Sequence, residues 1–424
     1  MRLTTILFLV AAIPSTAQIA TLTGKASLTG RAQIFPTASC LVTPAACNML
    51  PIFSFDPYST AGSFAGYADA TIRKDPQTGT LWMAYSWPHT AAGGSQVVDT
   101  HVAYSTDNGK TWSNSGLPNS GVLYPSQVVS NPTTGATNDH TCHEVMNIYP
   151  QVVNGVTYWY GIHQSYLVQQ GGAGTSNEPT TVRLMMAVAP GTATTGPMGL
   201  ASATPQYLGS SQNTDANFPA VNLTSISGLS NCTQFREPSL IMSGSNLYLQ
   251  TSCSDLTSIL QFSTTIPSDP TSVAGNWNWS YVGNFGTHAQ AQTLCSYVNG
   301  CGQNLYFTQG DIAKASNGSL LMVLSLVYSV GGGGKFSLGC VATELSQLSP
   351  PAFKLDSRGR VQVDAVVTST DSATGGPGSC TFDPSSMTGI IIAHKETNCA
   401  AGTAGCSTQG GEFTYLVASG TRPR

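Results

Sequence analysis

The apolar and polar positions of the chain repeat one pattern of short strands joined by tight turns. Each copy has an apolar strand, a turn with glycine, a second apolar strand and a third strand that ends in small residues. The pattern occurs five times, with turn glycines at Gly79, Gly155, Gly244, Gly318 and Gly389. Apolar runs separated by glycine turns predict antiparallel hairpins. The chain is therefore predicted to be all-β.

The spacing of these turns predicts the architecture. The glycines are 71 to 89 residues apart, which suits a propeller blade of about four strands with long loops. The first strands of the five units are predicted at 68–73, 148–153, 237–242, 311–315 and 380–383. A β-sandwich also has short strands but does not repeat the same order of elements. We predict a single propeller at residues 66–424, with five blades or alternatively six, and residues 18–65 as the candidate segment that closes the ring.

The composition excludes several classes of protein. Only 8% of the residues are charged, against about 25% in an average soluble domain. A 41% hydrophobic content excludes a disordered chain. The 16 Lys and Arg against 20 Asp and Glu form no basic tract, so we expect neither a nucleic-acid partner nor an anionic membrane.

The N-terminus has the features of an export signal. Arg2 is followed by an apolar run, Leu3 to Ala12, and by small residues before position 17. This order predicts a signal peptide at residues 1–17. No later stretch has the ~18 apolar residues that a membrane span needs. We therefore predict a secreted, soluble monomer, extracellular or periplasmic.

The cysteine content fits an exported protein. The chain has eleven cysteines, and exported chains commonly oxidise them to disulfides. Their short spacings predict four pairs: Cys40–Cys47, Cys232–Cys253, Cys295–Cys301 and Cys399–Cys406. Cys142, Cys340 and Cys380 remain, and the odd total requires at least one unpaired thiol.

The most specific motif is the segment from Ser105 to Trp112, which reads STDNGKTW. Asp107 is expected to accept backbone N–H bonds, Gly109 to take a left-handed conformation and Trp112 to pack into the sheet. The motif resembles the Asp-box of the sialidase/BNR superfamily of propellers. This resemblance implies a structural role for Ser105, Asp107, Gly109 and Trp112, away from the active site.

Two resemblances suggest an activity. Sialidases clamp the substrate carboxylate with three arginines, for which Arg73, Arg183 and Arg236 are candidates. The segment from Ala68 to Arg73 instead resembles the first blade of five-bladed arabinanases and xylosidases of glycoside hydrolase family 43. That resemblance implies Asp69 as catalytic base and Glu237 as general acid. The third acidic residue of that family, which lies between these two in the sequence, has no clear counterpart here, because Gln151 stands where Asp is expected.

The few charges lead to a similar set of residues. Innermost strands of a propeller begin at the mouth where ligands bind, and charged residues lie near all five starts: Asp69, Glu144, Arg236 with Glu237, Asp311 and Asp383. Carboxylates that face each other across a pocket supply the acid and base of glycosidic cleavage. We therefore predict catalytic roles for Asp69, Glu144 and Glu237, and substrate binding by Arg73, His140, His143, Arg236 and Asp311. The alternative is that such groups cap strands or pair with neighbouring blades.

The predicted function is a secreted, exo-type glycoside hydrolase without cofactor. His140 and His143 have the spacing of a weak zinc motif, but we expect them to hydrogen-bond a sugar and expect no metal. No Gly-x-Ser-x-Gly elbow occurs, which disfavours a serine hydrolase. The alternatives from other classes are a non-catalytic sugar-binding propeller and an adhesive propeller.

Overall fold

The computed structural model describes most of the chain between residues 48 and 417. The described residues are 48–52, 68–109, 111–131, 134–173, 179–213, 220–253, 258–272, 277–298, 300–314, 318–329, 335–367, 380–382, 390–394 and 412–417. The predicted signal peptide, Asp383 and the cysteine pairs Cys40–Cys47 and Cys399–Cys406 lie outside these residues.

The described strands form five sheets. The first sheet contains β2 (Ala68–Lys74), β3 (Leu81–Thr90), β4 (Gln96–Ser105) and β5 (Val122–Tyr124). The second contains β6 (Val128–Val129), β7 (Asp139–Val153), β8 (Val156–Val168), β9 (Arg183–Pro190), β10 (Gln206–Gly209) and β11 (Val221–Asn222). The third contains β12 (Phe235–Ser243), β13 (Asn246–Cys253), β14 (Ile259–Thr265) and β15 (Ser280–Phe285).

The last two sheets complete the circle. The fourth contains β16 (Leu305–Lys314), β17 (Leu320–Ser329), β18 (Lys335–Leu348), β19 (Pro351–Phe353) and β20 (Val363–Val367). The fifth combines β21 (Cys380–Phe382), β22 (Ile390–His394) and β23 (Glu412–Val417) with β1 (Asn48–Ile52). Because β1 pairs antiparallel with β23, a strand from the 18–65 segment joins the C-terminal sheet.

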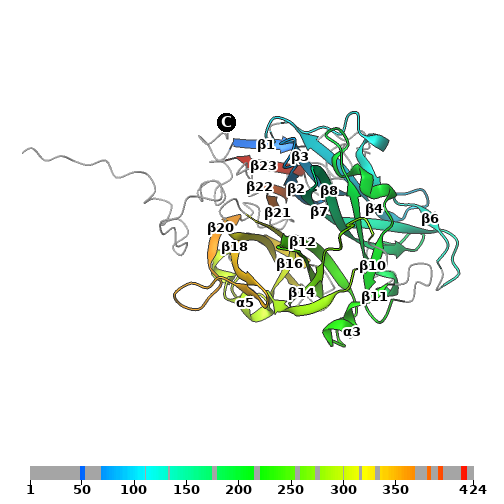
Figure 1. Cartoon of the computed structure of the whole chain (residues 1–424). Coiled ribbons are helices and arrows are strands. Elements are labelled where there is room, and N and C mark those ends of the chain that lie inside the picture. Colours follow the sequence, from blue (N-terminus) through cyan, green and yellow to red (C-terminus); the bar gives the residue numbers. More distant parts are fainter. Residues whose placement is uncertain are drawn as a thin grey trace, which may run out of the picture.

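The first strand of each repeat lies nearest to a common axis. β2, β7, β12 and β16 each contact the next in this order, and β21 contacts both β16 and β2. Figure 1 shows these five strands gathered around the middle of the molecule, with the remaining strands outside them. This closed ring of inner strands confirms the predicted all-β propeller.

The apolar core lies between neighbouring sheets. One cluster joins the first and second sheets through Trp82, Met146 and Trp159, and two further clusters join the second to the third and the third to the fourth. The first sheet packs against the second on one side and contacts the fifth through β2 on the other. This agrees with the burial of β3 from Leu81 to Pro88 and with its continuous apolar sequence.

Tight turns connect the strands as the repeat predicted. Gly79, Gly155, Gly244 and Gly318 have φ between +62° and +89°, a conformation in which a side chain is disfavoured. The helices of the described residues include α3 (Leu223–Ser227) and α5 (His288–Gln292), which are one turn long. No described helix is long and apolar enough to cross a membrane.

Two of the predicted disulfides lie in the described part of the chain. Cys232 is bonded to Cys253, and Cys295 to Cys301. Cys340 is also disulfide-bonded. Cys142 is a buried free thiol, which agrees with the unpaired cysteine that the odd total requires.

Candidate active site

The inner strands of the first three sheets share one kind of irregularity. β2, β7 and β12 each contain a β-bulge, between Ala68 and Thr71, Glu144 and Asn147, and Arg236 and Ser239. Bulges occur next to active sites, where they redirect a side chain.

The first residue of each of these bulges has left-handed backbone. Asp69, Val145 and Glu237 have φ of +51°, +56° and +53°. Such a conformation costs a non-glycine residue about 1–3 kcal/mol and tends to be retained at functional sites. The structure thus places Asp69 and Glu237 at equivalent positions of the first and third sheets, with Val145 between them.

Four charged side chains lie together at the bulges of these three strands, a part of the ring that we call the mouth. Asp69, Glu144, Arg236 and Glu237 are all partly exposed, and the charges of the other three act on Glu144. The sequence predicted that these residues converge, and the structure brings them together. Asp311 does not belong to this group.

Glu144 is the carboxyl group that these neighbours change most. Burial raises its pKa first, and the negative charges of Asp69 and Glu237 raise it further. Arg236 and a hydrogen bond with Tyr166 act in the opposite direction, and the net effect is a pKa of about 8. A pKa in this range favours the protonated form of Glu144 at neutral pH, whereas an ordinary glutamate is ionised there.

Two residues of β8 hold Glu144, and the sequence analysis missed both. Gln164 Nε2 donates to Glu144 Oε1 at 3.0 Å, and the Tyr166 hydroxyl bonds the same carboxyl group. The signal was present, because the polar triplet His163-Gln164-Ser165 interrupts an otherwise apolar strand. A polar residue at a buried strand position must find a partner.

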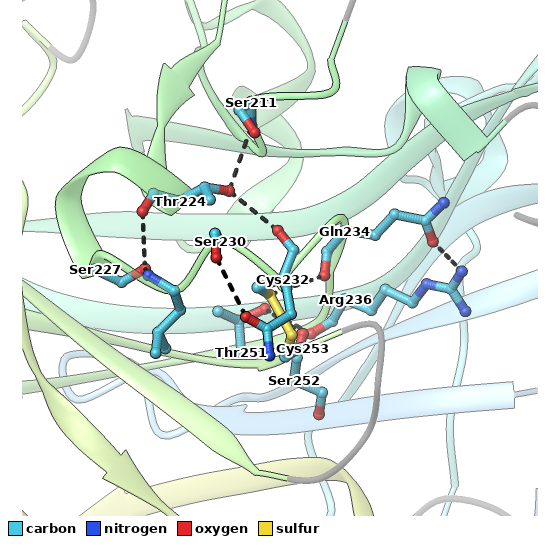
Figure 2. Close-up of a disulfide and its surroundings, with 12 residues drawn as sticks. Ser211, Thr224, Ser227, Ser230, Cys232, Gln234, Arg236, Thr251, Ser252 and Cys253 are labelled. Atoms are coloured by element: carbon cyan, nitrogen blue, oxygen red, sulfur yellow. Dashed lines mark hydrogen bonds between the residues drawn. A yellow bond between two sulfur atoms is a disulfide. The ribbon is translucent and has the colours of Figure 1, made fainter.

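Arg236 is held by Gln234, which directly precedes β12. Its Nη2 donates to Gln234 Oε1, and Figure 2 shows the two side chains side by side near the Cys232–Cys253 disulfide. The charges of Glu237 and Glu144 also act on Arg236. The disulfide closes the mouth end of the β12–β13 hairpin, since Cys253 lies opposite Phe235 in the register.

A polar network closes the axis below the mouth. Arg73 and Asp311 form a bidentate ion pair at 3.0 and 2.6 Å, with both residues 3% exposed. Asn147 Nδ2 donates to Asp311 Oδ1 at 3.2 Å, and Thr381 Oγ1 donates to Asp311 Oδ2 at 2.5 Å. Asn147 Oδ1 accepts the N–H of Leu240 at 3.0 Å, so the network joins all five inner strands. This placement gives Arg73 and Asp311 a role in joining blades, in place of the substrate contact expected from the sequence.

The surroundings of His143 do not fit the sugar-binding role that the sequence predicted for it and His140. His143 Nδ1 lies 3.0 Å from His163 Nε2, and both rings pack on Tyr124 between the first two sheets. Burial and the charge of Arg183 lower the pKa of His143 to about 4, so it is neutral at pH 7. His140 is 6% exposed. No group of three or more metal-binding side chains occurs among the described residues.

The arginines considered for a carboxylate clamp do not meet. Arg73 is paired with Asp311. Arg183 is 2% exposed, and its guanidinium lies 5.4 Å from the ring centre of Tyr207. Of the three, only Arg236 lies at the mouth.

The described residues of the Ser105–Trp112 motif, 105–109 and 111–112, form a compact turn at the opposite end of the first sheet. Asp107 Oδ1 accepts the N–H of Thr111 at 2.9 Å, Ser105 Oγ accepts the N–H of Gly109 at 2.8 Å, and Trp112 is 8% exposed. In the register Ser105 lies opposite Leu81, which lies opposite Lys74. The turn is thus remote from Asp69.

Comparison with known proteins gives similarity in structure only. The sequence matches no family model and no curated protein. Solved structures similar to it include a family 117 glycoside hydrolase from the marine bacterium Zobellia galactanivorans, with a TM-score of 0.42 and 11% identity over 87% of this chain and 89% of that one.

Two other solved structures are similar to a comparable degree. An α-L-arabinofuranosidase from Podospora anserina has a TM-score of 0.43 and 8% identity over 87% of this chain and 94% of that one. The sialidase of Trypanosoma rangeli has a TM-score of 0.40 and 10% identity over 87% of this chain and 59% of that one. Sialidases and other glycoside hydrolases, which the sequence motifs resemble, are thus among its structural neighbours. The similarity is one of overall fold, which the five sheets of the described residues show directly.

Proposed function

We propose that this β-propeller is a glycoside hydrolase that acts on an uncharged sugar. The observation that carries the proposal is the group of three coupled carboxyl groups at one mouth, which together retain a proton at neutral pH. Cleavage of a glycosidic bond needs one protonated and one ionised carboxyl group on opposite sides of the bond.

The positions of the bulges support particular roles. Asp69 and Glu237 stand at equivalent left-handed positions on either side of β7, so we assign them the two sides of the substrate. Glu237 donates the proton to the leaving oxygen, and Asp69 acts as base on water. Glu144 lies between these two strands and interacts with both carboxylates, so the proton that the group retains belongs to the coupled carboxyls rather than to one residue.

The charges at the mouth favour a neutral substrate. With one proton shared among the three coupled carboxyl groups, two negative charges remain and outnumber the single cation Arg236. A sugar carboxylate would be repelled by these charges, and the arginines that would bind it are engaged elsewhere. We therefore expect arabinosides or xylosides as substrates in preference to sialosides.

A substrate panel tests the activity and its class. Purified protein is assayed against nitrophenyl arabinofuranoside, xyloside and galactoside, against a methylumbelliferyl sialoside and against unactivated oligosaccharides. Hydrolysis of a neutral glycoside supports the proposal. Hydrolysis of the sialoside alone contradicts the assigned substrate class, and saturable sugar binding without turnover on any member would favour the non-catalytic alternative.

Variants then separate the roles. Glu237→Gln should lower turnover by about 10²-fold or more on substrates with a poor leaving group, and much less on activated aryl glycosides, because only the former need a proton donor. Asp69→Asn should lower turnover on both. The control Glu344→Gln removes a carboxylate that pairs with Lys354 on the fourth sheet and should leave turnover unchanged. If Glu144→Gln rather than Glu237→Gln shows the leaving-group dependence, Glu144 is the donor.

A further inference from the structure

Gln164 is a buried amide that contacts two acidic residues from neighbouring sheets. It lies on β8 directly opposite Glu144 in the register, and it is 1% exposed. Its Nε2 donates to Glu144 Oε1 at 3.0 Å, and its Oε1 accepts the backbone N–H of Glu237 at 3.3 Å. One side chain therefore joins the carboxyl group of the second sheet to the bulge of the third.

The two hydrogen bonds determine the orientation of the amide. A backbone N–H can only donate, so the oxygen of Gln164 must face Glu237 and its NH₂ must face Glu144. Glu144 Oε1 is then always an acceptor. When Glu144 is neutral, its proton is therefore on Oε2, the oxygen that does not face Gln164.

The bond to Glu237 supports its unusual backbone. A residue in a bulge is left out of the regular ladder of hydrogen bonds, and a buried N–H without a partner is costly. Gln164 supplies the partner at the residue whose φ is +53°. It thereby holds the conformation that directs the Glu237 side chain.

We propose that Gln164 is a positioning residue that assigns the proton of Glu144 to one oxygen and holds the Glu237 bulge. Its effect on turnover rests on the proposed function, whereas its effect on Glu144 does not. The other groups that act on Glu144 are Asp69, Glu237, Arg236 and Tyr166, and substitutions at position 164 leave all four in place.

The test measures the titration of Glu144 directly. The protein has six glutamates, so ¹³C NMR of carboxyl-labelled glutamate gives few signals, and that of Glu144 is the one missing in Glu144→Gln. Gln164→Met keeps the size and removes both bonds. Since a donor stabilises the ionised form, its loss should raise the pKa of Glu144 by about one unit.

Two further variants complete the design. Gln164→Leu also removes the donor to Glu144 and adds no charge, so it should also raise the pKa of Glu144, and it serves if Gln164→Met does not fold. Gln250→Met is the matched control, because Gln250 is an equally buried amide on β13 that bonds Ser239 and Gln261. It should leave the titration of Glu144 unchanged.

Kinetics add a second readout. Gln164→Met should lower kcat by about 10–100-fold, as expected for misplaced catalytic groups, with KM changed only a few-fold, while Gln250→Met keeps kcat. An unchanged Glu144 titration in both position-164 variants, or an equal shift in Gln250→Met, overturns the proposal. If the wild type hydrolyses no glycoside, the proposed function fails, and the titration alone still decides the role of Gln164.

Discussion

At the scale of single residues, the pKa of Glu144 is set by the groups around it. Its own position in the sequence, between a histidine and a valine, gives no reason for a shifted pKa. The shift arises from burial and from two carboxylates that belong to other sheets. Gln164 and Tyr166 then hold the carboxyl group in place from the adjacent strand.

The raised pKa of Glu144 predicts how stability depends on pH. The folded protein holds this proton up to about pH 8, whereas the unfolded chain releases it near its ordinary value of about 4.5. The folded state thus binds more protons in this interval, and stability falls as pH rises towards 8. The lowered pKa values of His143 and His163 act in the opposite direction only below about pH 6.5.

The measurement is thermal unfolding between pH 6.5 and 8.5. The Tm of the wild type should decrease across this range and level off above pH 8, whereas the Tm of Glu144→Gln should change less. Parallel curves for the two proteins would show that Glu144 is ionised at neutral pH.

At the scale of elements, the turn after β4 is a self-contained unit. Asp107 accepts hydrogen bonds from the backbone N–H and the hydroxyl of Thr111 and from the hydroxyl of Ser105. Asp107→Ala should lower the free energy of unfolding by about 1–3 kcal/mol, since it leaves these donors without a partner. Turnover per folded molecule should stay near normal, measured by denaturant unfolding alongside the glycoside assay. A well-folded variant without activity would place the turn in the catalytic machinery.

The cysteine pairs give a second prediction at this scale. Peptide mapping without reductant should recover Cys232 linked to Cys253 and Cys295 to Cys301, as in the structure, and Cys399 to Cys406, as the sequence predicts. Cys142 should resist alkylation in the native protein, because burial raises the pKa of its thiol to about 12, and should react fully in denaturant. Rapid native labelling of Cys142 would contradict its burial on β7.

At the scale of the whole molecule, the network around Asp311 ties the five inner strands together. Arg73 and Asp311 are separated by 238 positions in the chain and meet only when the ring closes. Removing one member of a buried pair leaves the other charge uncompensated, so Arg73→Met or Asp311→Asn should each cost about 3–5 kcal/mol of stability.

A double-variant cycle in urea tests this coupling. Arg73→Met combined with Asp311→Asn should cost clearly less than the two single changes added together, because the second change removes the charge that the first left unpaired. Additive losses of stability would mean that Arg73 and Asp311 have no coupling free energy, which would contradict this role of the pair.

The sequence by itself determined the features that depend on neighbouring residues. The strands, the left-handed glycine turns and the bonds of the Ser105–Trp112 turn follow from short apolar runs and local hydrogen bonding, which act over a few positions. The convergence of Asp69, Glu144, Arg236 and Glu237 was also predictable, since inner strands of a propeller share one mouth.

Only the tertiary structure decided which of the predicted polar residues meet. It paired Arg73 with Asp311 below the mouth and placed Gln164 between Glu144 and Glu237. These partners belong to different sheets, and their distance in the sequence carries no information about the contact. The physical reason is that a buried charge or amide must be satisfied by whatever group the packing of the blades brings within reach.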